Sequence, residues 1–358
     1  MTPILISRPE YSIKDGWHVA SATIAVNGKT HQLTYKVSEG PLAKGSEPFL
    51  SAALFPVMKL GQALQVSGMV SPKLLAATQT IQDMFHKWFP EFQKIQIQAE
   101  GGLSNEIRRT VDVGAFFSGG VDSFYTLLKN QDEITKIILI NGIMFENISE
   151  RPKVTKEIQK VAAELGKSLI VVEVNMREFS DQYTDWADHY VGSALASVGL
   201  LLSPQFRKIY IPATHSYDHL IPEGTHPLLD TLWSTESLQF EHSGCEANRV
   251  EKTAFIARSD IALQSLRVCD HVYSINCGQC EKCLRTMMGL QAVGALERCT
   301  AFDKKLDAEA VYSMKIMHDS VVFYEEEILR ALENSGNNHN LAEALRFSIN
   351  SYKYKKIA

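Results

Sequence analysis

The stretch FFSGGVDSFYTLL, residues 116–128, decides how this chain is interpreted, because it joins an apolar run to a helical pattern through small and polar residues. Gly119 and Gly120 permit positive φ and let a ligand approach the backbone closely. A helix that begins here directs unpaired N–H groups and its positive end toward an anion, and the hydroxyls of Ser118 and Ser123 add further donors. The loop therefore predicts a polyphosphate ligand.

An aspartate inside the loop refines this hypothesis. Asp122 would repel a bare phosphate, so its presence indicates either a bound Mg²⁺ ion or a helix cap. The alternative is a tight turn with an Asp or Ser cap and no ligand. A kinase-type phosphate loop is excluded, because the Gly-Lys-Ser/Thr sequence it requires is missing.

The chain that follows alternates short β-rich apolar runs with helical patterns. This alternation predicts an α/β fold with a parallel sheet and helices on both faces. Ligands of such sheets bind beyond the carboxyl ends of the strands, which is where residues 118–123 lie. The expected strands are residues 111–117, 136–141, 168–174 and 208–213, and the expected helices are residues 121–130, 154–165 and 186–202.

The first hundred residues follow a different pattern. Alternating runs on either side of Asn27 and Gly28 predict a β-hairpin, residues 49–66 and 71–89 carry apolar residues at helical spacing, and residues 94–100 predict a short strand. No catalytic grouping is visible in this segment. We therefore expect three parts, namely a separate small α+β module at residues 1–108, the phosphate-loop domain at residues 109–300, and a helical C-terminal appendage at residues 301–358.

Four of the six cysteines cluster in the sequence, at Cys269, Cys277, Cys280 and Cys283. Short Cys-x-x-Cys loops present two sulfurs to one tetrahedral ion, so the cluster predicts a structural Zn²⁺ site. A four-thiolate iron–sulfur cluster, or a redox role without metal, is the alternative. The other two cysteines, Cys245 and Cys299, are expected to be small buried hydrophobic residues.

Composition narrows the class of protein. The chain has 358 residues, 45% hydrophobic and 22% charged residues, and a net charge of −5, which is typical of a globular protein with a sizeable core. There is no signal-peptide pattern and no long apolar run, so we expect a cytoplasmic protein without a membrane span. The acidic balance argues against a nucleic-acid partner, and a homodimer is left open.

The string Ser-Gly-Gly-x-Asp-Ser at residues 118–123 resembles the signature of the PP-loop ATP pyrophosphatases. The resemblance implies a doubly wound α/β domain that cleaves ATP between its α and β phosphates. AMP passes to a substrate oxygen, pyrophosphate leaves, and a nucleophile then displaces AMP. The nucleotide-binding residues expected on this basis are Ser118, Gly119, Gly120, Val121, Asp122 and Ser123, with Asn141 and Gly142 beside the adenine; the chemistry is assigned to Asp122, Ser118, Ser123 and Lys252.

The loop and the Cys-x7-Cys-x2-Cys-x2-Cys pattern together are similar to the 7-cyano-7-deazaguanine synthase (QueC-like) family, over roughly residues 111–290. About 110 residues precede the loop here, however, and two stretches typical of that family are absent. We therefore expect an adenylating, ligase-like enzyme that activates a carboxylate or similar oxygen of a different, unidentified acceptor for a nitrogen nucleophile. A PP-loop sulfurtransferase, as in tRNA modification, and a non-catalytic nucleotide sensor are the alternatives.

Several further residues have two interpretations each. Lys252 either neutralises the leaving pyrophosphate or is an exposed helical lysine, and Arg285 either binds a helix end near the cysteines or reaches the phosphates. Asn141 and Gly142 either contact adenine or form a plain turn. A Pro- and His-rich segment either lines the mouth of the active site or has no chemical role; its candidate residues are His215, Asp218, His219 and His226.

Overall fold

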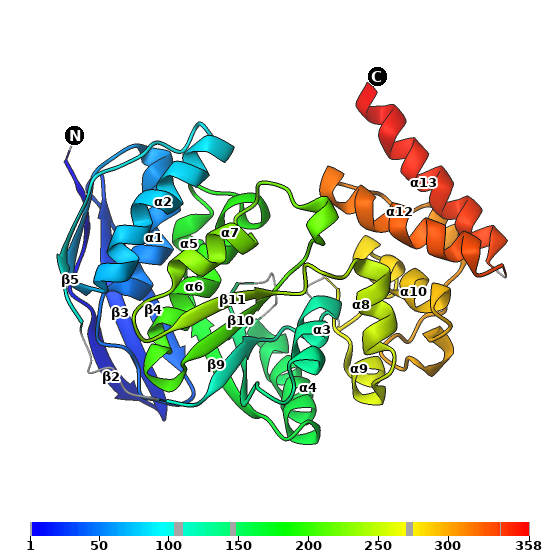
Figure 1. Ribbon diagram of the computed structural model, residues 1–358, viewed down its shortest axis with the longest axis horizontal. Coiled ribbons are helices and arrows are strands. Elements are labelled where there is room, and N and C mark those ends of the chain that lie inside the picture. The colour runs from blue at the N-terminus through cyan, green and yellow to red at the C-terminus, as the bar shows by residue number, and fades with distance from the viewer. Residues whose placement is uncertain (1, 104–109, 144–147, 270–274, 337, 358) are drawn as a thin grey trace.

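The computed structural model describes residues 2–103, 110–143, 148–269, 275–336 and 338–357, and one 11-stranded sheet runs through it (Figure 1). The strand order is β11-β10-β7-β8-β9-β4-β3-β1-β5-β6, with β2 paired to β3. The strands are β1 (Ile4–Ile6), β2 (Glu10–Lys14), β3 (Trp17–Val26), β4 (Lys29–Val37), β5 (Leu64–Val70), β6 (Ile97–Gly101), β7 (Val113–Phe116), β8 (Lys136–Asn141), β9 (Ser168–Val174), β10 (Lys208–Pro212) and β11 (Gln239–Ser243).

The helices cover both faces of this sheet and then form a C-terminal cluster. A π-helical turn at Trp186–Tyr190 leads directly into α6. The helices are α1 (Glu47–Leu60), α2 (Pro72–Trp88), α3 (Val121–Lys129), α4 (Arg151–Glu164), α5 (Arg177–Ser180), α6 (Val191–Leu201), α7 (Pro227–Asp230), α8 (Arg249–Ile256), α9 (Asp260–Ser265), α10 (Glu281–Ala292), α11 (Ala308–Tyr312), α12 (Asp319–Asn334) and α13 (His339–Ile357).

Strands β11, β10, β7, β8 and β9 are parallel neighbours in that order. The chain starts in the middle at β7, winds outward through β8 and β9, and returns to the other side through β10 and β11. This is the doubly wound order, and it puts a topological switch between β7 and β10. The predicted α/β class and parallel sheet are confirmed for this half of the molecule.

Alternate side chains of the central strands pack in two different hydrophobic cores, because successive side chains of a strand point to opposite faces of the sheet. In β8, Ile138 and Ile140 pack in the core that contains α1 and α6, whereas Ile137 and Leu139 pack in the core that contains α3 and α4. Burial on both faces explains why these strands read as continuous apolar runs.

The expectation of a separate N-terminal module is wrong. Strand β4 pairs antiparallel with β9, with Val37 opposite Val172, so the N-terminal strands extend the central sheet (Figure 1). Tyr35 of β4 also hydrogen-bonds Ser197 of α6 inside the shared core. Helix α1 is buried at every position from Glu47 to Met58, so it needs neighbours on more than one side. The boundary predicted at residue 108 lies outside the described residues.

One helix of the N-terminal segment ends earlier than predicted. Residues 49–66 carry helical spacing, but α1 stops at Leu60 because Gly61 takes the left-handed conformation with φ 64° and its N–H caps Val57 and Met58. Residues 64–70 form strand β5 instead. The hairpin at Asn27 and Gly28 is confirmed, with both residues at positive φ.

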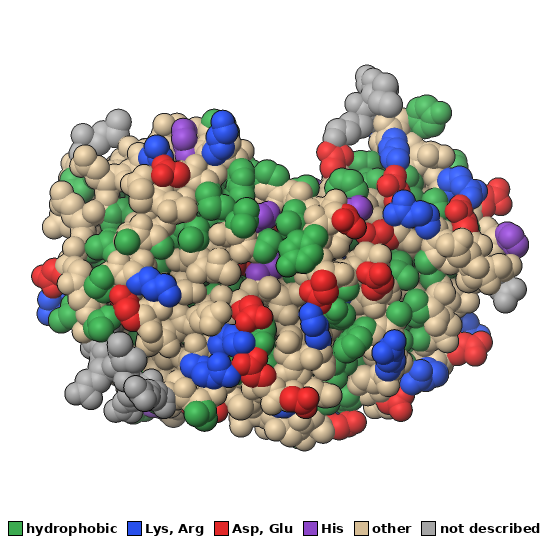
Figure 2. All heavy atoms as spheres, viewed as in Figure 1, with side chains coloured by type: hydrophobic (Ala, Val, Ile, Leu, Met, Phe, Trp, Pro, Cys, Tyr) green, Lys and Arg blue, Asp and Glu red, His purple; other side chains and the backbone are tan. Residues whose placement is uncertain are grey.

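The C-terminal segment is helical, as predicted, and α10, α11, α12 and α13 share a third hydrophobic core. Helix α12 also contacts α8, and α8 packs against α3, so the C-terminal segment reaches the surroundings of the glycine loop. None of the helices in the described ranges combines the length and hydropathy needed to cross a bilayer. On the face seen in Figure 2, acidic and basic side chains are interspersed rather than gathered by sign.

Candidate functional site

The glycine loop connects β7 to the first turn of α3. Gly119 has φ 82°, which favours glycine, and a Cβ there would also lie only 3.2 Å from side-chain atoms of both Arg267 and Ile158. Gly120 is the N-cap residue of α3. The hydroxyl of Ser118 accepts from the Gly120 N–H at 3.4 Å, and that of Ser123 donates to the Gly120 carbonyl at 3.0 Å. The loop is therefore a preorganised turn at a helix N-terminus.

A cavity of about 350 Å³ opens at this loop, at the switch between β7 and β10. This volume falls in the range of small-molecule pockets, roughly 300–1,000 Å³. Its walls come from the loop, from the ends of β8 and β10, from α4, from α6 and the turn before it, and from three later segments at residues 223–225, 267 and 282. The lining residues that bear on function are Ser118, Gly120, Asp122, Ser123, Asn141, Trp186, Thr214, Glu223, Thr225, Arg267 and Lys282.

Two cations hold the carboxylate of Asp122. Lys252 Nζ lies 3.2 Å from Oδ1, and Arg249 Nη2 donates to Oδ2 at 3.0 Å. Burial opposes ionisation of Asp122, but the charges of Arg249 and Lys252 outweigh it and lower its pKa. Burial, offset only in part by Asp122, also lowers the pKa of Lys252. From the sequence we expected Mg²⁺ to neutralise Asp122, but in the structure Lys252 and Arg249 provide this positive charge.

Helix α8 is positioned by a capping box. Asn248 Oδ1 accepts from the Glu251 N–H at 2.9 Å, and Glu251 Oε2 accepts from the Asn248 N–H at 2.8 Å. The helix therefore begins at Arg249, and Arg249 and Lys252 lie three residues apart on one face. Lys252 is completely buried, so its interpretation as an exposed helical lysine is excluded.

The C-terminal appendage contributes to the same cluster through α12. The Arg249 guanidinium lies 4.9 Å from the ring centre of Tyr324, and the Tyr324 hydroxyl bonds His215 Nδ1 at 2.8 Å. Glu327 accepts a hydrogen bond from the Arg249 N–H at 2.9 Å. Residues 319–334 are therefore part of the site's surroundings, which the sequence did not indicate.

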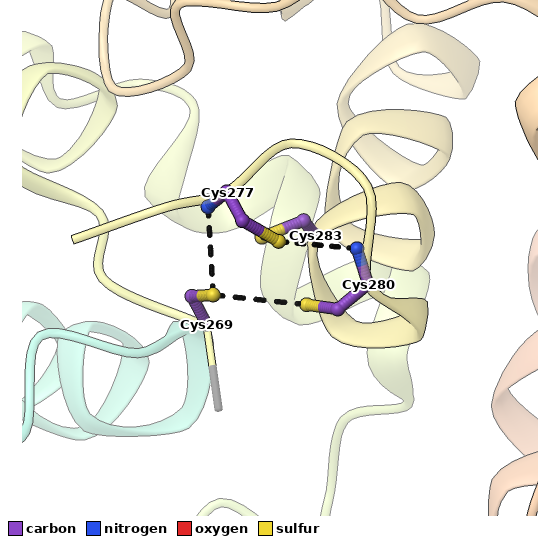
Figure 3. Close-up of side chains that lie close together, drawn as sticks. All are labelled: Cys269, Cys277, Cys280 and Cys283. Atoms are coloured by element: carbon purple, nitrogen blue, oxygen red, sulfur yellow. Dashed lines mark hydrogen bonds between the residues drawn. The ribbon is translucent and has the colours of Figure 1, made fainter. Parts of the chain in front are cut away.

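The four cysteines converge, as Figure 3 shows. All four sulfurs lie within 4.8 Å of one another, with 3.9 Å between Cys277 and Cys283 and 3.8 Å between Cys269 and Cys280. Tetrahedral Zn–S bonds of about 2.3 Å require sulfurs about 3.8 Å apart, so the spacing fits a zinc ion. The cysteines form no disulfide. The group can hold a metal ion.

The cysteine group and the cavity are neighbours. Arg267 precedes Cys269 by two residues, Lys282 lies between Cys280 and Cys283, and both cations line the cavity. The Arg267 N–H also donates to the carbonyl of Gly119 at 2.8 Å. A metal at the cysteines would therefore anchor two cationic segments beside the glycine loop.

Of the remaining residues predicted to bind the nucleotide, one lines the cavity and two lie elsewhere. Asn141 is buried and lines the cavity. Gly142 faces a second hollow with Arg151 and Lys36, and it must be glycine because a Cβ would lie 2.0 Å from the Val174 carbonyl oxygen. Val121, the first residue of α3, is packed in the core that α3 shares with α4.

The histidines do not form one cluster. His215 is buried and bonded to Tyr324, His219 packs against Phe323, and Asp218 is exposed. His226 caps α7 and lies against Trp88. Arg285 forms an ion pair with Glu281 at 3.0 Å and lies over the Tyr324 ring. Cys245 and Cys299 are buried, as predicted.

Four functional candidates escaped the sequence reasoning: Arg249, Glu223, Arg267 and Lys282. The spacing of Arg249 three residues before Lys252 was a usable signal, and so was the position of Lys282 inside the cysteine motif. The sequence around Glu223 contains no motif that would have marked this residue as part of a site. The chain matched no protein-family model, no curated protein and no solved structure.

Proposed function

We propose that this protein is an ATP-dependent adenylating enzyme that forms AMP and pyrophosphate. The observation that supports this most directly is the cavity at the β7–β10 switch, which combines a glycine loop at a helix N-terminus with cationic side chains. In this proposal the loop of Ser118, Gly119, Gly120 and Ser123 binds the phosphates of ATP, and Asn141 lies toward the adenine.

The proposed reaction has two steps. An oxygen of the acceptor, a carboxylate or similar group, attacks the α-phosphorus of ATP, and the bond to the β-phosphate oxygen breaks. Pyrophosphate leaves and the acceptor carries AMP. A nitrogen nucleophile then attacks the activated carbon, and AMP departs with the acceptor oxygen.

The protein's own groups would stabilise the charge that develops on the departing pyrophosphate. Arg267 and Lys282 line the cavity, and Lys252 and Arg249 lie immediately behind Asp122. Preorganised donors of this kind are often the largest single contribution to catalysis. Both oxygens of Asp122 are engaged by cations, so we assign Asp122 to positioning Lys252 and Arg249, and Mg²⁺ would arrive bound to the ATP phosphates.

The alternatives are less well supported by the geometry. A sulfurtransferase needs reactive thiols, but four cysteines belong to the cluster and Cys245 and Cys299 are buried. A nucleotide sensor would bind ATP without turnover, and the experiment below separates it from an enzyme.

The test follows the phosphates of ATP. The full-length protein is incubated with Mg²⁺, ammonium, a small-molecule extract as source of acceptors, and ATP labelled at the α or γ phosphate. We expect equal amounts of AMP and pyrophosphate, formed only when the extract is present. ADP and orthophosphate would refute the proposal, and tight ATP binding without turnover would identify a sensor.

A matched pair of serine variants sharpens the result. Ser123 lines the cavity, and its hydroxyl holds the Gly120 carbonyl in the loop at 3.0 Å; Ser123→Ala removes this bond and should lower turnover about 100-fold, because the loop would no longer hold its N–H donors in place. Ser313→Ala, at an exposed position after α11, should leave turnover unchanged.

A further inference from the structure

We propose that Glu223 makes the cavity selective for an acceptor that carries a planar nitrogen group with two N–H donors, such as an amidine. Glu223 lies in the wall of the same cavity as the glycine loop. The role of this ligand as the acceptor rests on the proposed function, whereas the binding preference of Glu223 does not.

The carboxylate of Glu223 lacks the partners that a buried acid normally has. Its side chain is only 16% exposed, yet Oε2 is buried without a hydrogen bond. Among the described residues the one close polar contact of the carboxylate is between Oε2 and His215 Nε2, at 3.2 Å, and no described residue donates a hydrogen bond to Oε1. Buried polar atoms are nearly always paired, so this carboxylate has capacity for donors from a ligand.

Two buried side chains, those of His215 and Tyr324, pack next to the carboxylate of Glu223. The Tyr324 hydroxyl lies 2.8 Å from His215 Nδ1 and 3.4 Å from Nε2, and Nε2 in turn lies 3.2 Å from Glu223 Oε2 without forming a hydrogen bond to it. Tyr324 is in turn packed against Arg249. Because Oε2 is buried against His215, a ligand in the cavity would reach the carboxylate through Oε1.

A second hydrogen-bond acceptor for the ligand is two residues from Glu223 in the sequence. Thr225 also lines the cavity, and its hydroxyl donates to Asp230 Oδ2 at 2.7 Å. Asp230 is itself paired with His242 at 2.7 Å. Because the Thr225 proton is used on Asp230, its oxygen can only accept from a ligand, which suits a group with two N–H donors.

The charges of the cavity favour a nitrogen group over a phosphate or a metal ion at this point. Asp122 and Glu223 are the two carboxylates among the described lining residues. Asp122 is neutralised by Lys252 and Arg249, whereas Glu223 pairs with no described lysine or arginine. A phosphate would be repelled here, and Mg²⁺ requires near-octahedral oxygen coordination.

The apolar side chains that line the cavity favour a ligand with a flat apolar ring. Trp186, Val191 and Leu195 line the cavity from the α6 side, and Ile138 and Ile140 line it from the sheet. A ligand with an aromatic or heteroaromatic ring beside its amidine-type group would fill this space. Benzamidine, with benzamide and benzoate as the neutral and anionic analogues, is therefore an appropriate set of probes.

The experiment measures binding of the three probes by calorimetry, with the full-length zinc-loaded protein and no ATP. We expect benzamidine to bind most tightly and benzoate least. Glu223→Gln, which keeps the size of the side chain, should weaken benzamidine binding about tenfold or more. Glu297→Gln, an exposed matched control, should leave it unchanged. Thermal melts of both variants verify that they fold.

Three outcomes would overturn the inference. They are no measurable binding of benzamidine, equal benzamidine affinity in wild type and Glu223→Gln, and a Mg²⁺ affinity that disappears in Glu223→Gln while benzamidine binding persists. Because the assay needs no turnover, its failure is distinct from failure of the adenylation proposal. Amidine binding without AMP formation would support Glu223 and refute adenylation.

Discussion

The ammonium group of Lys252 lies 3.2 Å from Asp122 and donates a 2.7 Å hydrogen bond to the carbonyl oxygen of Ala213. Asp122 is in the first turn of α3, which follows β7, and Ala213 follows the end of β10. One buried cation therefore joins the two strands between which the cavity opens. The site depends on this pair for its shape as well as its charge.

Asp122→Asn should lower the free energy of unfolding by about 3 kcal/mol, because Lys252 and Arg249 would keep their charges in a buried place without a counter-charge. Urea denaturation measures this loss. A double-mutant cycle with Lys252→Met should show that the two losses are not additive.

The control for this variant is Asp132→Asn, an exposed acid with an expected change below about 0.5 kcal/mol. If Asp122→Asn were as stable as Asp132→Asn, the ion-pair assignment would be wrong.

The second prediction concerns pH. Burial alone would lower the pKa of His242, but its bond to Asp230 outweighs burial and raises the pKa to about 9, above the usual 6.5 of a histidine. A raised pKa means that the protonated ring stabilises the folded state fully below pH 6.5, and that this contribution is lost as the pH rises toward 9. The loss should reach about 3 kcal/mol.

The measurement compares unfolding free energies across this pH range for wild type and His242→Gln. The variant should lack the decline that His242 produces in the wild type. Parallel pH profiles of the two proteins would show that the Asp230–His242 pair does not titrate as described.

The third prediction concerns the metal. Elemental analysis should find one zinc ion per chain, and Cys280→Ser should lose it and become less stable, because metal binding to thiolates is coupled to folding. ATP affinity should also fall by about tenfold, since Arg267 and Lys282 would lose their anchor. Cys299→Ser, outside the cluster, should retain the metal. An iron absorption band instead of zinc would contradict the assignment.

The fourth prediction tests whether the N-terminal segment and the rest of the chain unfold as one cooperative unit. Phe55 of α1 stacks on Phe85 with ring centres 3.7 Å apart and meets Trp233 of the C-terminal half edge-on at 5.9 Å. Phe55→Ala should cost about 3–5 kcal/mol and preserve a single unfolding transition. Ile13→Ala, at a position 71% exposed, serves as control. Two separate transitions would favour independent modules.

Much of the fold was predictable because its signals are local. The alternating runs around Asn27 and Gly28 became a hairpin, and the apolar run of residues 136–141 became β8 without change. Where a local rule competed with another, the prediction failed: Gly61 ended α1 although the helical spacing of apolar residues continued beyond it.

By itself the sequence determined the glycine loop, the cysteine cluster and the strand–helix alternation, because each depends on residues close together along the chain. Only the tertiary structure decided that β4 joins β9, that Arg249 and Lys252 share Asp122, and that His215 lies between Tyr324 and the cavity-lining Glu223. Such contacts join segments tens to hundreds of residues apart. They follow from which apolar faces can be buried together, and no local pattern records that choice.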